Sequence, residues 1–278
     1  MTSDRSARLK RSSDADGNVA GDPTNPRPLV RGAQRLFIII EHLSARPMTL
    51  TEVARSVDLP KSTALRFLRT LEESGWVVRD KDGVYALGPA IVGLAAQYLS
   101  GNPLVEVATP AIRALNAELD ETISLSRRVG LTRVCVQEFP STKNLRLVLG
   151  LGERGPLHAG ASGLLLFAYM PPHERQRLAD QGFERYTSRT ITDLDKLEAE
   201  AVKIRERGWA LTQGQKTVGG LAIAVPITVP GTNGEIAALG IFGPEARCST
   251  KREQRRWLDA LLETAKEIDA TTVNYRGA

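Results

Sequence analysis

Residues 49–87 read TLTEVARSVDLPKSTALRFLRTLEESGWVVRDKDGVYAL and predict two helices joined by a tight turn. Thr49 and Glu52 have the spacing of a capping box, which begins a short first helix. Pro60 suits the first turn of the second helix, whose apolar residues recur at helical spacing until Gly75 ends it. Only about three residues separate the two helices, so this stretch predicts a helix-turn-helix.

On either side of this helix pair, the sequence predicts one more helix and a β-hairpin. Apolar residues at helical spacing indicate a helix over residues 31–44. Residues 76–79 and 84–87 are strand-like and flank the turn sequence Asp80-Lys81-Asp82-Gly83. Three helices followed by a hairpin are the order of a winged helix-turn-helix DNA-binding domain.

The outward face of the second helix of the pair, with the hairpin, is the predicted DNA-reading surface. Basic residues are concentrated here, since residues 27–83 hold ten Lys or Arg against seven Asp or Glu. Short hydroxyl side chains and an arginine suit base edges, whereas the remaining basic side chains suit phosphates. A plain solvated surface is the alternative interpretation. The predicted base contacts are Ser62, Thr63 and Arg66, and the predicted phosphate contacts are Lys61, Arg69, Arg79 and Lys81.

The overall composition excludes several classes of protein. The 278 residues are 42% apolar and 25% charged, which is typical of a globular protein and, at this length, of two domains. No apolar run approaches the roughly 18 residues of a membrane span, and residues 1–21 lack the apolar core of a secretory signal. We therefore expect a cytoplasmic protein. Two distant cysteines and three histidines predict neither a disulfide framework nor a metal site, and no cofactor is expected.

After the hairpin, strands and helices alternate in a pattern that predicts an α+β domain with an antiparallel sheet. Strands are predicted over residues 123–128, 133–138, 145–149, 209–213, 221–229 and 236–242. Helices are predicted over residues 105–119, 163–170, 173–181, 194–207 and 250–271. The predicted divisions of the chain are a polar tail (1–28), the winged helix-turn-helix domain (29–88), a linker helix (89–101) and a second domain (102–278).

Short motifs in both domains carry a family resemblance. They are residues 59–64 (LPKSTA), 71–72 (LE), 75–76 (GW), 156–159 (PLHA), 206–209 (ERGW), 222–227 (AIAVPI) and 243–244 (GP). Over residues 31–273 the chain closely resembles the IclR-type bacterial transcriptional regulators. The resemblance implies a winged-helix dimer on operator DNA, a GAF-like domain for effector binding and oligomerisation, and frequently a dimer of dimers. Departures from the family pattern, near the family's ligand pocket, occur at Leu164, Gln215, Gly240 and Phe242.

The sequence Gly160-Ala161-Ser162-Gly163 precedes an apolar helix, and Ser162 is predicted to cap it. Unpaired N–H groups at a helix start attract carboxylates, although the same sequence also suits a helix start without a ligand. Because the family places its effector here, we expect a small organic acid as the effector. The expected contacts are Gly160, Ala161 and Ser162 at the helix start, Leu147, Ala222, Gly240 and Phe242 as apolar walls, and Asn144, Gln213 and Gln215 as polar groups.

The favoured function is an effector-responsive transcriptional regulator that binds double-stranded operator DNA as a homodimer, because one recognition helix reads only a few base pairs. One alternative is a constitutive DNA-binding protein whose second domain only oligomerises. Another is an enzyme with an attached DNA-binding module. No acid–base constellation accompanies Cys135 or His158, so no catalytic residue is assigned. The effector, the target genes, repression or activation, and dimer or tetramer do not follow from the sequence.

Overall fold

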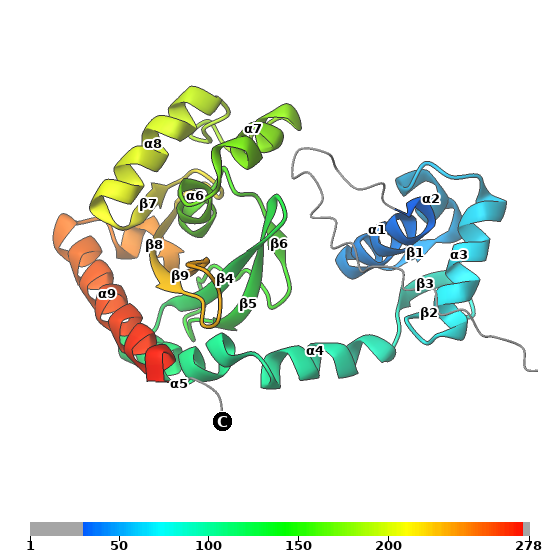
Figure 1. Ribbon diagram of the computed structural model, residues 1–278, viewed down its shortest axis with the longest axis horizontal. Coiled ribbons are helices and arrows are strands. Elements are labelled where there is room, and N and C mark those ends of the chain that lie inside the picture. Colours follow the sequence, from blue (N-terminus) through cyan, green and yellow to red (C-terminus); the bar gives the residue numbers. More distant parts are fainter. Residues whose placement is uncertain (1–29, 275–278) are drawn as a thin grey trace, which may run out of the picture. The chain divides into compact units, whose positions relative to one another are not determined.

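The computed structural model describes residues 30–274, so the tail predicted over residues 1–28 lies outside the described residues. The chain divides between Gly93 and Leu94 into an amino-terminal and a carboxy-terminal unit, each compact by itself (Figure 1). Helix α4 (Ala90–Ser100) spans this division and occupies most of the segment predicted as a linker helix. None of the helices within residues 30–274 combines the length and the apolar character that a membrane crossing needs.

The amino-terminal unit has the predicted order of three helices and a hairpin. Its elements are α1 (Arg31–Ala45), β1 (Met48–Thr49), α2 (Leu50–Ser56), α3 (Lys61–Glu73), β2 (Val77–Arg79) and β3 (Val84–Leu87). The three strands form an antiparallel sheet of order β1-β3-β2. The sequence did not predict β1, because two residues are too few to show a period. The winged helix-turn-helix is confirmed.

One apolar core fixes the orientation of α3 within this unit. Its buried side chains come from all three helices and from the sheet: Ile39, Leu43, Met48, Val53, Leu68, Leu71, Val77 and Tyr85. The predicted capping box is also present, since the Glu52 N–H donates to Thr49 Oγ1 and the Thr49 N–H donates to the Glu52 carboxylate. The cap fixes where α2 begins, and the core holds one side of α3 inward.

Replacing Thr49 by alanine should destabilise the amino-terminal unit by about 1 kcal/mol, because an N–H at the start of α2 loses its acceptor. Urea denaturation of the full chain measures this. Thr49→Ser keeps the hydroxyl and is the matched control. An unchanged denaturation midpoint for Thr49→Ala would show that the cap does not contribute to stability.

The carboxy-terminal unit is built on a six-stranded antiparallel sheet of order β6-β5-β4-β9-β8-β7. Its strands are β4 (Thr122–Val129), β5 (Thr132–Phe139), β6 (Arg154–Gly155), β7 (Ala210–Gln213), β8 (Gly220–Thr228) and β9 (Ile236–Pro244). The central pair, β4 and β9, joins segments that are far apart in the sequence. The α+β class and the antiparallel sheet are confirmed.

Helices cover both faces of this sheet (Figure 1). They are α5 (Pro103–Leu119), α6 (Ala161–Ala168), α7 (Pro172–Asp180), α8 (Leu194–Arg207) and α9 (Lys251–Asn274). One core cluster joins α5 and α9 to one face of the sheet, and a second cluster joins α6, α7 and α8 to the other. Because side chains alternate along a strand, β4 directs Leu125 toward α5 and α9 and Ser124 toward α6.

The strand predicted over residues 145–149 is wrong: this segment is a loop. Side chains, rather than a neighbouring strand, bind its backbone. Thr122 Oγ1 donates to the Leu147 carbonyl at 2.6 Å, and the Glu138 carboxylate accepts the N–H groups of Leu149 and Gly150 at 2.7 and 2.9 Å. The two-residue strand β6 takes the place beside β5 instead. Residues 145–149 therefore do not join the sheet, although their sequence alternates like that of a strand, and they lie near the start of α6.

Candidate functional site

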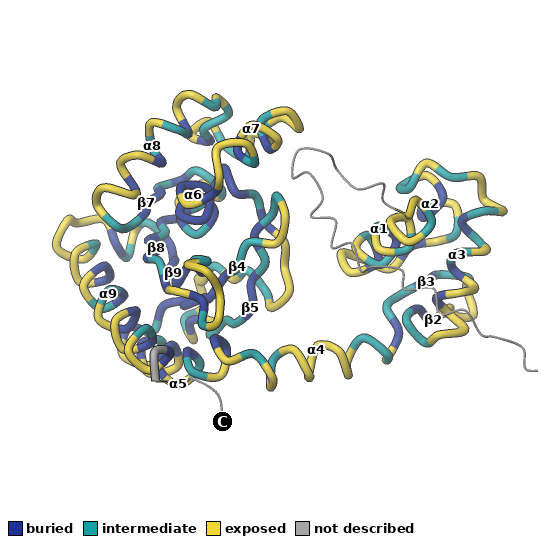
Figure 2. Tube along the Cα trace, viewed as in Figure 1, coloured by how far each residue is buried: buried dark blue, intermediate teal, exposed yellow. Residues whose placement is uncertain are grey.

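The first candidate site is the outward face of α3 together with the hairpin. Buried and exposed residues both occur along α3 (Figure 2), and its buried residues are Ala64, Leu68 and Leu71. Of the predicted DNA contacts on α3, Thr63 is half-buried, and the exposed ones are Lys61, Ser62, Arg66 and Arg69. Arg79 and Lys81 are exposed on the hairpin. Phe67, by contrast, is half-buried against the core of the unit.

The basic side chains of this surface are not neutralised by neighbouring carboxylates. Within the described part of the chain, Lys61, Arg66, Arg69 and Lys81 form no ion pair. The Arg79 guanidinium lies over the Tyr85 ring, 5.5 Å from its centre. Cations that are not paired within the protein remain available to DNA phosphates. The surface therefore has the charge and the exposure that duplex binding requires.

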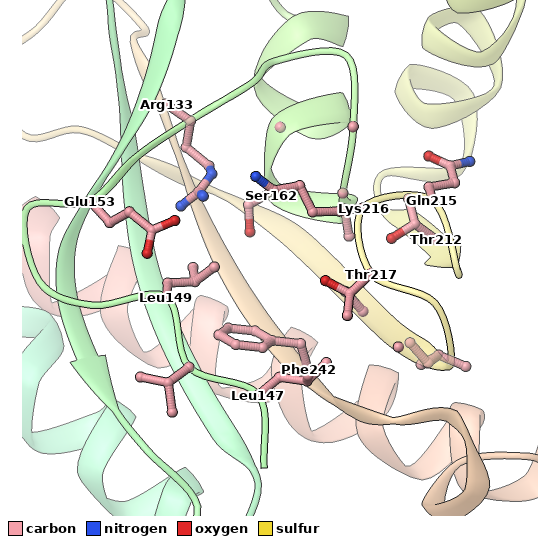
Figure 3. A pocket seen from close by; sticks show the side chains of 18 residues that line it. Arg133, Leu147, Leu149, Glu153, Ser162, Thr212, Gln215, Lys216, Thr217 and Phe242 are labelled. Atoms are coloured by element: carbon pink, nitrogen blue, oxygen red, sulfur yellow. The ribbon is translucent and has the colours of Figure 1, made fainter. Parts of the chain in front are cut away.

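The second candidate site is a cavity of about 200 Å³ in the carboxy-terminal unit, where α6 begins (Figure 3). The loop that carries Leu147 and Leu149 forms one wall, and strands β8 and β9 form another. Seven of the ten residues predicted to bind an effector line this cavity: Leu147, Gly160, Ala161, Ser162, Gln215, Ala222 and Phe242.

The other three predicted residues do not line it. Asn144 is exposed on the loop before Leu147. Gln213 donates from its amide to the Glu245 carboxylate. A Cβ atom at Gly240 would lie 2.7 Å from Ser162 Oγ, so this glycine lets α6 approach the sheet closely. Among the lining residues, Gln215 directs its amide away from Arg133 and Ser162 (Figure 3).

The helix start itself differs from the prediction. Gly160, not Ser162, is the N-cap residue, and its φ of +83° favours glycine. Ser162 lies in the first turn, which places its hydroxyl over Gly240 rather than in a capping hydrogen bond. The N–H groups of the first turn have no partner within the helix, as at any helix start. Here they border the cavity, because Ala161 and Ser162 both line it.

The structure adds charged residues that the sequence analysis did not assign to this site: Arg133 of β5, Glu153 and Lys216. Arg133 is only 4% exposed, and its Nη1 donates to Ser126 Oγ at 3.2 Å. Burial lowers the pKa of Arg133 from its ordinary value. Burial and the nearby Arg133 charge lower the pKa of Lys216, whose ammonium lies 4.4 Å from the centre of the Tyr186 ring.

Cys135 and His158 are buried, and their surroundings give them a structural role. Burial raises the pKa of the Cys135 thiol to about 12, which leaves it protonated and unreactive at neutral pH. His158 Nε2 hydrogen-bonds the Glu184 carbonyl at 2.8 Å, and the ring contacts Phe183. Within residues 30–274, no group of three or more His, Cys, Asp or Glu side chains is arranged to hold a metal ion.

Comparisons with known proteins identify the same family, IclR, in both units. Residues 32–81 match the family model "IclR helix-turn-helix domain", and residues 96–270 match "Bacterial transcriptional regulator IclR C-terminal". The HTH-type transcriptional regulator BhcR of Paracoccus denitrificans is 31% identical over 243 residues, which cover 86% of each chain.

Solved structures with the same fold include an IclR-type transcriptional regulator from Alicyclobacillus acidocaldarius. It is 27% identical, with a TM-score of 0.73 over 87% of this chain and 96% of that one. An IclR homologue from Microbacterium hydrocarbonoxydans, complexed with 4-hydroxybenzoate, is 22% identical. Its TM-score is 0.67 over 86% of this chain and 99% of that one, which shows likeness of fold.

Proposed function

Since the chain belongs to the IclR family of bacterial transcriptional regulators, we propose that a small organic acid bound in the cavity at the start of α6 changes its affinity for operator DNA. Like the relatives it matches, the chain is a DNA-binding transcriptional regulator and not an enzyme. A protein that acts on the bacterial chromosome works in the cytoplasm, and we place it there.

For operator recognition, the proposed base-reading residues are Ser62, Thr63 and Arg66, near the start and in the middle of α3. Arg66 can form two parallel hydrogen bonds with a guanine, whereas the hydroxyls adapt to several bases. Lys61, Arg69, Arg79 and Lys81 are proposed to contact phosphates, which need charge rather than a fixed geometry. A single α3 covers few base pairs, so we propose that a homodimer reads a palindromic operator.

Lys61→Ala should weaken binding to operator and to random duplexes alike, because a phosphate contact carries no sequence information. The slope of log affinity against log salt concentration should become shallower by about one unit. Gel-shift titrations at several salt concentrations measure both quantities, with an operator selected from a pool of random duplexes. Loss confined to the operator would assign Lys61 to base recognition instead.

The observation that supports an acid effector is the division of the cavity into a polar and an apolar part. The first turn of α6 supplies N–H groups and the positive end of the helix dipole, which favour a carboxylate. Leu147, Ala222 and Phe242 supply apolar surface. The 4-hydroxybenzoate bound to the Microbacterium homologue is a carboxylate with an apolar ring, and a ligand of this kind matches such a division.

A thermal-shift screen of aliphatic and aromatic carboxylates on the full chain tests the proposal. At about 100 times its dissociation constant, a ligand stabilises a protein by roughly 2.7 kcal/mol, which such a screen detects. Each acid that stabilises the chain is then added to operator titrations. An acid that binds without changing operator affinity would favour the alternative of a constitutive DNA-binding protein whose second domain only oligomerises.

A further inference from the structure

We propose that Arg133 and Lys216 together hold one carboxylate group beside Ser162, so that the cavity selects a monocarboxylate with a compact apolar body. This inference rests on the proposed function in one respect only: it takes the bound acid to be the effector. It assigns the ligand's chemical class and the two side chains that recognise it.

Arg133 is a buried cation in the cavity wall with few partners in the protein. A guanidinium has five N–H donors, and the one side-chain partner found for it in the described residues is Ser126 Oγ. No carboxylate forms an ion pair with it in that part of the chain. Glu153 and Glu138 are near enough for their charges to raise the pKa of Arg133, but Glu138 is engaged with the backbone of Leu149 and Gly150. A buried guanidinium that no carboxylate binds directly is unfavourable, so Arg133 is suited to receive an anion.

Lys216 lines the same cavity as Arg133 but comes from a different part of the chain. Arg133 reaches in from β5, and Lys216 reaches in from the connection between β7 and β8. Figure 3 shows both cationic ends directed toward the region of Ser162. The two charges are close enough for Arg133 to lower the pKa of Lys216. An anion between them removes this repulsion and also receives N–H groups from the first turn of α6.

The balance of charge argues for a single carboxylate. Besides the two cations, the cavity is lined by one acidic residue, Glu153, whose charge raises the pKa of Lys216. The lining therefore carries one positive charge in excess. A monocarboxylate neutralises this excess, whereas a dicarboxylate would leave a negative charge in a partly buried site.

The size and the remaining walls define the rest of the ligand. Leu147, Leu149 and Phe242 lie on the side of the cavity away from Lys216 in Figure 3. The volume of about 200 Å³ is smaller than the roughly 300–1,000 Å³ of sites for drug-sized molecules. Benzoate and hexanoate are simple members of the class so defined.

Isothermal titration calorimetry on the full chain tests the proposal with four probes: benzoate, hexanoate, benzamide and phthalate. Benzamide has the shape of benzoate without its charge, and phthalate carries a second carboxylate. The variants are Arg133→Gln and Lys216→Gln. The matched control is Arg128→Gln, because Arg128 is paired with Arg133 across the two strands but binds Glu174 and does not line the cavity.

We expect Arg133→Gln to weaken benzoate binding by about 10- to 100-fold and Lys216→Gln by about 3- to 10-fold, with no change in Arg128→Gln. Benzamide should bind at least tenfold more weakly than benzoate, and phthalate no more tightly. In the absence of ligand, Arg133→Gln should melt at or above the wild-type temperature, because it removes a buried cation that forms no ion pair.

Four results would each overturn the assignment. They are wild-type binding of neither monocarboxylate at about 10 mM, equal affinity of wild type and Arg133→Gln for benzoate, tighter binding of phthalate than of benzoate, or a clearly lowered melting temperature of unliganded Arg133→Gln. The proposed function fails separately, if benzoate binds the wild type through Arg133 and operator affinity does not respond to it.

Discussion

Replacing Ala161 by leucine is expected to abolish the effect of an acid ligand on operator binding. Ala161 is the first residue of α6, is 1% exposed and lines the cavity. A leucine there adds three carbon atoms to a space of about 200 Å³ and covers the N–H groups of the first helical turn. Operator titrations with and without benzoate should therefore superimpose for this variant and differ for the wild type.

Two further variants make this result specific to the cavity. Ala222→Leu fills the same space from β8 and should have the same effect. Ala199→Leu makes the identical change on the exposed surface of α8 and should leave the ligand response intact. Thermal melting of each variant identifies any that is overpacked and unstable. A wild-type ligand response in both Ala161→Leu and Ala222→Leu would locate the effector elsewhere.

Replacing Arg66 by alanine is expected to reduce operator affinity by about 5- to 150-fold, which corresponds to about 1–3 kcal/mol. Arg66 is exposed on α3 and forms no ion pair within the described residues, so its removal should not change the melting temperature. The loss should be accompanied by relaxed preference at one base position, because a bidentate contact discriminates one base from the others.

Titration of a panel of operators with single base changes measures this preference. Lys61→Ala is the internal comparison, since its loss should be uniform across the panel. If Arg66→Ala lost the same affinity on operator and on random duplexes, Arg66 would be a phosphate contact and base recognition would fall to Ser62 and Thr63.

The amino-terminal unit could be predicted almost completely from the sequence, because its signals are local. The Thr49–Glu52 capping box and the apolar stripe of α3 each lie within one or two helical turns. Such a stripe also fixes the opposite face, so the exposed positions Lys61, Ser62 and Arg66 follow from it. The predicted bounds of these helices differ from the structure by only a residue or two, as is usual at helix ends.

The carboxy-terminal site could be predicted only in part, because contacts between distant segments decide it. Residues 145–149 alternate like a strand, yet part of this segment is held as a loop, because Thr122 donates a hydrogen bond to it and Glu138 accepts one from it. Arg133 lies in a predicted strand, but the neighbouring sequence does not indicate that its side chain lies on the α6 side of the sheet. A register shift between Leu125 and Ser126 helps to set which face β5 presents.

If acid in the cavity changes operator affinity, the cavity and the DNA-reading surface must be coupled. Fluorescence anisotropy of a labelled operator, titrated with the full chain in the presence and absence of saturating benzoate, gives the coupling between the two sites. We expect the two dissociation constants to differ by about 5- to 150-fold, the usual range for allosteric coupling. Identical titration curves, with benzoate binding confirmed by calorimetry under the same conditions, would show that acid in the cavity does not control operator binding.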